Sequence, residues 1–455
     1  MTEQLKLKLN DSKATRWGAL VIVAFTMMAA YYVNDVVAPL KTMLETDLAW
    51  SSTDFGFFTG GYSFLNVFFL MLIWGGLILD RFGIRFTGKL ATILMVGGTA
   101  LEYYAMTGLA GADATLFGIN EIFGYKTGVF VAFAGYSIFG VGAEVAGITV
   151  SKIIAKWFKG KELATAMGVQ VALARIGSQA GYAVAIPLAR AFGISTPVLL
   201  GLVLLLGGMI AFFVFAVMDT AAIAAGTEDE EEKFSFKDVK NILVNPGFWL
   251  IALLCVLFYS CVFPFQKFAS ELMIIKYGIN ENVAGTFAGL PALGALILTP
   301  VFGGFIDKRG KSASIMLLGS AMLICVHFIY AIPDINYWLV AIVLMIILGI
   351  AFSLVPSAMW PAVAKIFPVS QLGTAYALIF FIQNIGLWGI PTLIGWVLDA
   401  YCISGKKPDG TNMYDYTVPM CIFTGIACLS LIVALLLKKT DKKYGYKLEE
   451  PNIQK

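Results

Sequence analysis

Two charged residues stand inside long apolar stretches of this sequence. Glu144 lies within the apolar segment 130–150, and Arg175 lies within the next one, 164–188. A lone ionised side chain at membrane depth costs at least about 2.5–3.5 kcal/mol, so such residues usually face a partner or a wet cavity. A guanidinium binds a carboxylate through two parallel hydrogen bonds, and a carboxylate accepts from an ammonium group. The pair therefore predicts a site for a small zwitterionic solute.

The empty site allows two interpretations. Glu144 and Arg175 could pair with each other until a ligand separates them, or they could form a permanent structural ion pair. Buried ion pairs are weak evidence of stabilisation, because the cost of desolvation offsets the attraction. We therefore favour the binding site.

Further polar side chains at membrane depth are candidates for the same site. Tyr62 and Asn66 are four residues apart and would share one helix face. Amide side chains could bind a peptide link without adding charge, or they could join helices, and the sequence leaves both open. The candidates besides Glu144 and Arg175 are Tyr31, Asp35, Tyr62, Asn66, Gln383 and Asn384.

Two other groups receive structural interpretations. Lys267 and Glu271, also four residues apart, are interpreted as an ion pair at the membrane interface. His327 stands alone among apolar residues, so we interpret it as a packing residue.

The composition identifies the class of protein. Of 455 residues, 59% are hydrophobic and 13% are charged, and the mean hydropathy is +0.82. Apolar runs long enough to cross about 30 Å of hydrocarbon as helices recur throughout the chain. The strict alternation over segments of about 10 residues that marks a β-barrel does not occur. The fold class that we predict is an all-α membrane protein.

The apolar runs predict twelve transmembrane helices. Basic residues are concentrated on the side of the membrane that holds both chain ends, with 24 of the 32 there and seven on the opposite side. Because positively charged loops stay in the cytoplasm, we expect both termini to be cytoplasmic. The predicted spans are 17–39, 54–79, 87–108, 127–151, 164–188, 197–218, 247–271, 283–306, 313–332, 336–358, 372–398 and 417–437.

The longest cytoplasmic loop divides the chain. Residues 219–246 contain the acidic run 228–232, which repels itself and stays solvated. We interpret this loop as a linker between two six-helix bundles. The expected parts are the bundle 1–218, the linker 219–246, the bundle 247–437 and a cytoplasmic tail, 438–455.

The two halves repeat each other. A Gly-x-x-x-Asp-Arg-x-Gly-x-Arg motif at 76–85 has a counterpart at 303–311, and 155–166 has a counterpart at 364–375. Such repeats indicate two pseudo-symmetric bundles with a site between them at mid-membrane. A charge cluster at each motif could hold the cytoplasmic side closed in one state and release it in another; it could also be a topology signal alone. The predicted gating residues are Gly76, Asp80, Arg81, Gly83, Arg85, Asp307 and Lys308.

This motif resembles the signature loop of the major facilitator superfamily. A finer resemblance, running from about Tyr31 to Asp399, is to the lysosomal dipeptide transporter branch, the major facilitator domain-containing protein 1-like proteins. It departs from that branch in the loops and at both ends. The stretches that carry it are 80–85, 157–163, 174–178, 262–265, 300–303, 371–376 and 382–386.

The resemblance implies facilitated movement of dipeptides by alternating access. It also implies that an acid on the fourth helix and an arginine on the fifth bind the two ends of the peptide; here these are Glu144 and Arg175. The Glu-x-x-Glu-Arg pattern of proton-coupled peptide transporters is absent from the first helix. We therefore predict a uniporter. The alternatives are an organic anion exchanger and a proton-coupled symporter of the same fold.

An enzyme is not expected, since the chain has one histidine and no His-Glu-x-x-His motif. The six cysteines show no zinc-binding or disulfide spacing, and we predict no cofactor. The expected partners are a dipeptide and the lipid bilayer, with no nucleic acid, and a functional monomer. Short extracytoplasmic loops favour a cell membrane over a lysosomal one.

Overall fold

The computed structural model describes residues 12–111, 114–158, 162–224 and 236–451. Long helices dominate, as a bilayer requires, because a helix satisfies its backbone hydrogen bonds internally. The helices are α1 (Lys13–Val36), the 3-10 turn η2 (Ala38–Leu40), α2 (Lys41–Asp47), α3 (Ser52–Phe68), α4 (Met71–Thr107), α5 (Thr127–Trp157), α6 (Leu163–Phe192), α7 (Thr196–Ala224), α8 (Phe236–Val244), α9 (Pro246–Tyr277), α10 (Glu281–Ala288), α11 (Leu290–Arg309), α12 (Ser312–Ala331), α13 (Trp338–Ile366), α14 (Val369–Tyr401) and α15 (Thr417–Tyr444).

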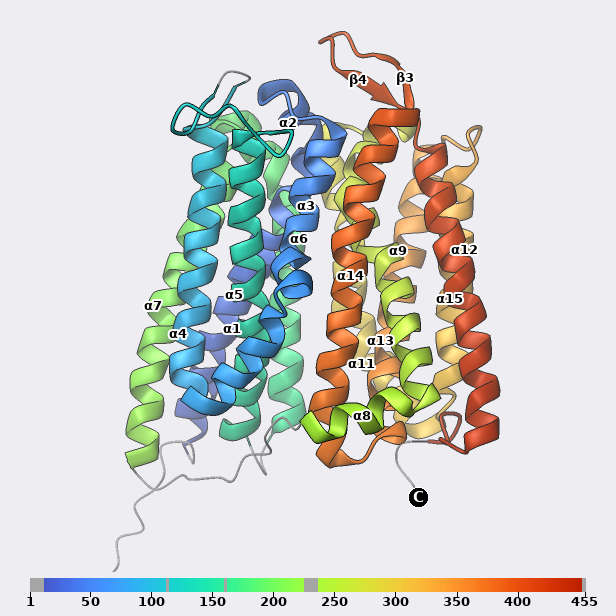
Figure 1. Ribbon diagram of the computed structural model, residues 1–455. Coiled ribbons are helices and arrows are strands. Elements are labelled where there is room, and N and C mark those ends of the chain that lie inside the picture. Colours follow the sequence, from blue (N-terminus) through green and yellow to red (C-terminus); the bar gives the residue numbers. More distant parts are fainter. Residues whose placement is uncertain (1–11, 112–113, 159–161, 225–235, 452–455) are drawn as a thin grey trace, which may run out of the picture.

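Two short antiparallel hairpins complete the fold. Strand β1 (Glu121–Ile122) pairs with β2 (Tyr125–Lys126), and β3 (Ile403–Lys406) pairs with β4 (Asn412–Tyr414). Both hairpins lie at the end of the helices that is uppermost in Figure 1, and we call it the hairpin end. The opposite end holds the first and last described residues, and we call it the terminal end.

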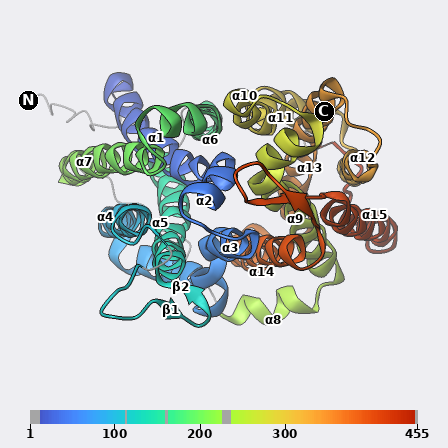
Figure 2. The ribbon, with the colours of Figure 1, turned by 90° about the horizontal axis from the view of Figure 1, so that it is seen from above.

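The helices form two side-by-side groups (Figures 1 and 2). In the first half, α1 packs along α6 and α7, and α4 packs along α5. In the second half, α9 packs along α14 and α15, and α11 and α12 pack along α13. The arrangement agrees with the predicted pair of bundles, while the exact domain limits stay a prediction.

All twelve predicted spans fall on helices. Among the described residues, nine helices are long and apolar enough to cross a membrane, and the bent pair of α3 and α4 adds a tenth candidate. Helix α6 is not apolar enough to be counted among these candidates. Its polar residues Gln170 and Arg175 line the cavity described below. Gly83, with φ 72°, interrupts α4 inside the signature motif and separates the predicted second and third spans.

One predicted span was wrong in being continuous. The predicted helix 54–79 ends at Phe68 and restarts at Met71, bent by 58°, and Leu70 there has φ 54°. No glycine or proline marks this break, so local sequence could not predict it. The predicted helix 283–306 falls on α10 and α11, which meet at Gly289 and together form one candidate span, Glu281–Arg309.

The two halves meet most closely where α3 crosses α14, in the part of the molecule nearer the hairpin end. A Cβ atom on Gly56 would lie 2.4 Å from the carbonyl oxygen of Pro391, and one on Gly395 would lie 2.3 Å from that of Ser52. Only glycine permits this approach of two backbones. The contact closes the space between the halves on that side.

The linker and the tail contain structure that the sequence analysis did not anticipate. Helix α8 lies across the terminal end, beside α14 (Figure 1). After α15 the chain turns back, so that Leu448 is buried and Glu449 binds the backbone and side chain of Ser314. The acidic run 228–232 lies outside the described residues.

Candidate functional site

A cavity of about 840 Å³ lies between the two halves. Its walls come from α1, α3, α4, α5 and α6 of the first half and from α9, α13 and α14 of the second. It extends from Lys267 to Asp80 and Gly373 near the terminal end. A chamber of this size lined by both halves is the kind of space in which ligands bind.

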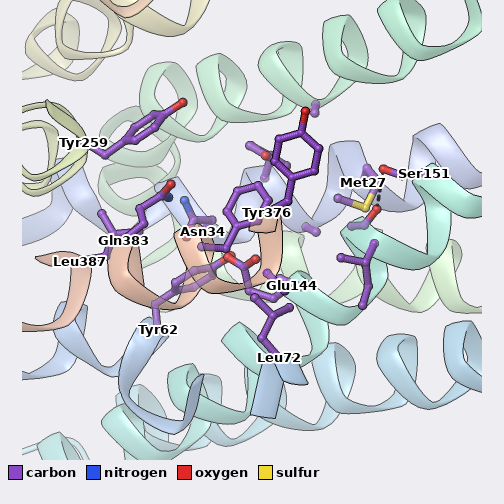
Figure 3. Close-up of a pocket in the computed structure, with 18 of the residues that line it drawn as sticks. Met27, Asn34, Tyr62, Leu72, Glu144, Ser151, Tyr259, Tyr376, Gln383 and Leu387 are labelled. Carbon is purple, nitrogen blue, oxygen red and sulfur yellow. Dashed lines mark hydrogen bonds between the residues drawn. The ribbon is translucent and has the colours of Figure 1, made fainter. Parts of the chain in front are cut away.

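Glu144 lines this cavity and is held by a neighbouring helix. The hydroxyl group of Tyr62 donates a hydrogen bond of 3.0 Å to Oε1 of Glu144, and Figure 3 shows these two side chains pointing toward one another. Helix α3 can approach α5 so closely because Gly140 has no side chain. A Cβ atom at this position would lie 2.0 Å from the carbonyl oxygen of Tyr62. The carboxylate therefore has a fixed position and a neutral partner.

Arg175 lines the same cavity, and its charge lies against aromatic rings. Its Cζ atom is 5.6 Å from the ring centroid of Tyr31 and 4.8 Å from that of Phe352. Helix α6, which carries Arg175, packs closely on α1 at Gly177, where a Cβ atom would lie 2.1 Å from the carbonyl oxygen of Met28. In the described part of the chain Arg175 makes no ion pair, so the expected pairing with Glu144 does not occur in this state.

The other predicted binding residues divide into two groups. Tyr31, Tyr62 and Gln383 line the cavity, while Asp35, Asn66 and Asn384 do not. Asn384 donates to the carbonyl oxygen of Phe380 in its own helix. Asn66 is buried and forms no hydrogen bond with the other described residues. All eight assignments stay predictions.

Lys267 also lines the cavity, although its spacing in the sequence predicted only an ion pair at the membrane interface. Its Nζ atom lies 3.2 Å from Oδ1 of Asp35, and it donates to the carbonyl oxygen of Asn34 at 2.6 Å and to the hydroxyl group of Tyr136 at 3.4 Å. Asp35 also accepts a hydrogen bond from Ser178. The predicted pair of Lys267 with Glu271 was wrong, because Lys267 faces the first half.

Glu271 belongs instead to a buried group of charges at the hairpin end. We call Lys41, Glu45, Glu271 and Lys407 the hairpin-end cluster. Nζ of Lys41 lies 2.5 Å from carboxylate oxygens of both Glu45 and Glu271, and Nζ of Lys407 lies 3.5 Å and 3.7 Å from the same two residues. Tyr416 donates to Glu271. The cluster thus joins the halves with balanced charge.

Aromatic residues of the second half supply another feature that no sequence pattern singled out. Tyr259, Trp360 and Tyr376 line the cavity, and Figure 3 shows Tyr259 and Tyr376 beside Gln383 and Glu144. Aromatic residues recur along every apolar segment of this chain, so composition could not distinguish cavity residues from lipid-facing ones. Only the packing of the helices selects them.

The predicted gating residues of the first half make local contacts at the terminal end. Asp80 lies 3.2 Å from Nζ of Lys152. Arg85 donates to Thr220 at 2.8 Å and lies 3.6 Å from the buried Asp219, which also accepts from Lys156 at 3.1 Å. These contacts join helices of one half.

The remaining gating candidates occupy different surroundings. Gly76 lines the cavity, Lys308 is exposed, and Arg81 lies over the ring of Phe82, 5.5 Å from its centroid. Asp307 is half-buried at the corresponding place in the second half. The gating role of the whole set stays a prediction.

Another pair ties the start of α1 to the loop before α6. Arg16 donates to Glu162 at 2.8 Å, and this hydrogen bond lowers the pKa of the Glu162 carboxyl group from its ordinary value. The pair lies within the first half at the terminal end.

Comparisons with known proteins agree with this architecture. A sequence model of the Major Facilitator Superfamily matches residues 20–391 and 276–452. The lysosomal dipeptide transporter MFSD1 of Homo sapiens is 30% identical over 449 residues, which are 95% of this chain and 88% of that protein. Its counterpart in Danio rerio is 27% identical over 436 residues, 93% of this chain and 86% of that one. The cell membrane that we predicted finds no support among these relatives, which are named for the lysosome.

Solved structures show the same fold. A mutant of the nucleoside transporter NupG superposes with a TM-score of 0.69 at 13% identity, over 95% of this chain and 100% of that one. A bacterial homologue of the human lysosomal transporter Spinster, in an inward-facing and occupied conformation, gives 0.67 at 14% identity, over 95% of this chain and 98% of that one. At these identities the likeness concerns the fold alone.

Proposed function

This chain belongs to the Major Facilitator Superfamily of membrane transporters, and we propose that it carries dipeptides by alternating access, as a uniporter. In this proposal Arg175 binds the peptide carboxylate and Glu144 binds its ammonium group. The relatives named as dipeptide transporters support the substrate class. The state of these two charged groups in the cavity supports their roles.

The observation that carries the proposal is the difference between the two cations of the cavity. Lys267 has three donors and three oxygen partners within 3.4 Å, so its hydrogen-bonding capacity is used inside the protein. Arg175 lines the same cavity, and neither an ion pair nor a hydrogen bond engages it among the described residues. An unengaged guanidinium in a cavity is suited to a carboxylate, which its planar fork can bind through two hydrogen bonds.

Glu144 provides the matching acceptor. One of its oxygen atoms is held by Tyr62, and a neutral hydroxyl group leaves the negative charge of the carboxylate uncompensated. An ammonium group of the ligand would supply the missing charge.

The size of the cavity favours broad selectivity for side chains. Its volume of about 840 Å³ is near the upper end of the roughly 300–1,000 Å³ typical of small-molecule sites. Tyr259, Trp360 and Tyr376 offer apolar and hydrogen-bonding surface without a further charge. We expect the two peptide termini to be recognised strictly and the side chains loosely.

We place the terminal end in the cytoplasm. The support is the distribution of basic residues, 24 on that side of the predicted spans against seven on the other. The protein is a multi-pass membrane protein, and which membrane it occupies stays a prediction.

Uptake of a radiolabelled dipeptide into proteoliposomes tests the proposal. Free dipeptides should compete strongly, whereas N-acetylated and C-amidated ones should compete weakly, because each lacks one charged end. Arg175→Ala and Glu144→Gln should abolish uptake while the protein still folds and inserts. Arg175→Lys should also be severely impaired, since it keeps the charge and loses the planar fork.

The same assay separates the alternatives. If N-acetylated peptides compete as well as free ones, Glu144 does not bind an ammonium group and an organic anion exchanger becomes the better description. If uptake follows an imposed pH gradient in the absence of a peptide gradient, the protein is a proton-coupled symporter. If Arg175→Ala and Glu144→Gln both transport at the original rate, the site lies elsewhere.

A further inference from the structure

The guanidinium group of Arg175 lies against one aromatic ring from each half of the molecule. Tyr31 comes from α1 of the first half, and Phe352 comes from α13 of the second. The guanidinium carbon lies closer to Phe352, at 4.8 Å from the ring centroid, than to Tyr31, at 5.6 Å. Both distances fall within the roughly 6 Å over which the face of a ring attracts a cation.

The ring of Phe352 is itself held firmly. It is 2% exposed. Phe263 meets it at a centroid distance of 5.3 Å and an interplanar angle of 82°, and Tyr259 meets it at 6.3 Å and 85°. Edge-to-face contacts of this kind fix the orientation of a ring. Phe352 therefore presents a rigid face to the guanidinium.

A ring and a carboxylate hold an arginine in different ways. A carboxylate accepts the N–H donors of the guanidinium and so occupies them. A ring face attracts the positive charge through its quadrupole and provides no oxygen acceptor. Two rings can thus hold the side chain of Arg175 in place and leave its donors for a ligand.

We propose that Phe352 is a positioning residue for carboxylate recognition, acting through Arg175. This inference rests on the proposed function, in which Arg175 binds the carboxylate of a dipeptide. By fixing the guanidinium before the ligand arrives, Phe352 reduces the ordering that binding would otherwise require. Phe352 thus contributes to binding of the carboxylate of the ligand and not to binding of its ammonium group.

A role in packing alone predicts a different result. A buried phenylalanine that only fills space would, when shortened, lower the stability of the protein and affect all ligands alike. A positioning role lowers affinity only for ligands that carry a carboxylate. The preference for a free dipeptide over its C-terminal amide separates the two roles, because these ligands differ only at that end.

The experiment compares inhibition constants for a dipeptide and its amide in the proteoliposome uptake assay. We expect the wild-type protein to prefer the free dipeptide and Phe352→Leu to reduce that preference about tenfold, the effect of losing one desolvated cation–π contact. Phe352→Tyr keeps the ring and should restore the preference. Phe423→Leu is the matched control, because Phe423 is equally buried and packs on Phe265, away from the cavity; it should leave the preference unchanged.

If Phe352→Leu no longer transports, the same ratio can be measured as ligand-induced thermal stabilisation of the purified protein. A wild-type protein that binds both ligands equally would refute carboxylate recognition, and this inference with it. A wild-type preference that Phe352→Leu leaves intact would overturn the inference and leave the proposed function standing. A preference that falls equally in Phe423→Leu would show that packing alone accounts for the effect.

Discussion

The two ends of the molecule use their charged residues differently. At the hairpin end, four ion pairs between described residues join one half to the other: Lys41 with Glu271, Lys407 with Glu45, Lys267 with Asp35, and Arg190 with Glu281. The backbone amides of Ser52 and Thr53 add hydrogen bonds to Asp399 across the same boundary.

At the terminal end, each ion pair between described residues stays within one half. Asp80 pairs with Lys152, and Asp219 pairs with Arg85 and Lys156, all in the first half. In the second half the pairs are Lys311 with Glu449 and Lys447 with Glu450.

This difference, which concerns the ion pairs between described residues, agrees with the position of the cavity. The hairpin end is closed by contacts that must separate if the halves are to part there, and the cavity extends toward the terminal end. Pairs within a half do not have to break when the halves rock against each other. The comparison suggests that charges at the hairpin end set the balance between states, while those at the terminal end stiffen each half.

The largest effect is expected from Lys41→Met in the hairpin-end cluster. Lys41 contacts both Glu45 and Glu271, and its loss would leave two buried carboxylates to share Lys407. Removing one partner from a buried ion pair costs about 3–5 kcal/mol, and hydration of the glutamates in the open state would relieve that cost. We expect the hairpin end to open, measured as a longer distance between spin labels at positions 47 and 408.

A second substitution checks the cause. Adding Glu271→Gln to Lys41→Met removes one of the two competing carboxylates, so the label distance should return part of the way to its original value. An unchanged distance in Lys41→Met would contradict the role of the cluster in closure. An equal opening in the double variant would show that charge balance is not the reason.

A smaller effect, of a different kind, is expected from Asp219→Asn at the terminal end. Asp219 is fully buried and accepts from Lys156 and from the indole N–H of Trp157. Neutralising it leaves basic groups without their charged partner, at a cost of about 2–3 kcal/mol. The midpoint of thermal unfolding should fall, while the label distance at the hairpin end stays the same.

Asp441→Asn is the corresponding change in the second half. Asp441 accepts one backbone hydrogen bond, from Leu448 at 3.0 Å, so the unfolding midpoint should fall less than for Asp219→Asn. A shift of the label distance in Asp219→Asn would contradict the division of roles between the two ends.

The sequence predicted the parts of this comparison that depend on one helix at a time. The apolar runs located the spans, and Glu144 and Arg175 stood out because a charge inside such a run is costly. The structure places both in the cavity. The break at Leu70 escaped prediction, since no residue type there demands it.

Contacts between helices were beyond the reach of a single sequence. Lys267 and Glu271 have the spacing of a local pair, yet each pairs with the first half, Lys267 with Asp35 and Glu271 with Lys41. Spacing along a helix specifies which side chains share a face and not what that face meets. The repeat of 155–166 at 364–375 has an offset of 209 residues, which aligns Asn384 with Arg175. Asn384 does not line the cavity, so the repeat predicted the backbone arrangement and not the chemistry of the site.

The smallest effect is expected from Arg190→Ala. This substitution tests whether an exposed ion pair between the halves helps to keep the hairpin end closed. Arg190 pairs with Glu281 across the halves, but the two side chains are 44% and 41% exposed. Exposed ion pairs contribute at most about 1 kcal/mol, and salt screens them over roughly 10 Å at 0.1 M. We expect the label distance to change little at low salt and not at all at high salt. A large opening, close to that of Lys41→Met, would mean that the number of bridges and not their burial keeps the hairpin end closed.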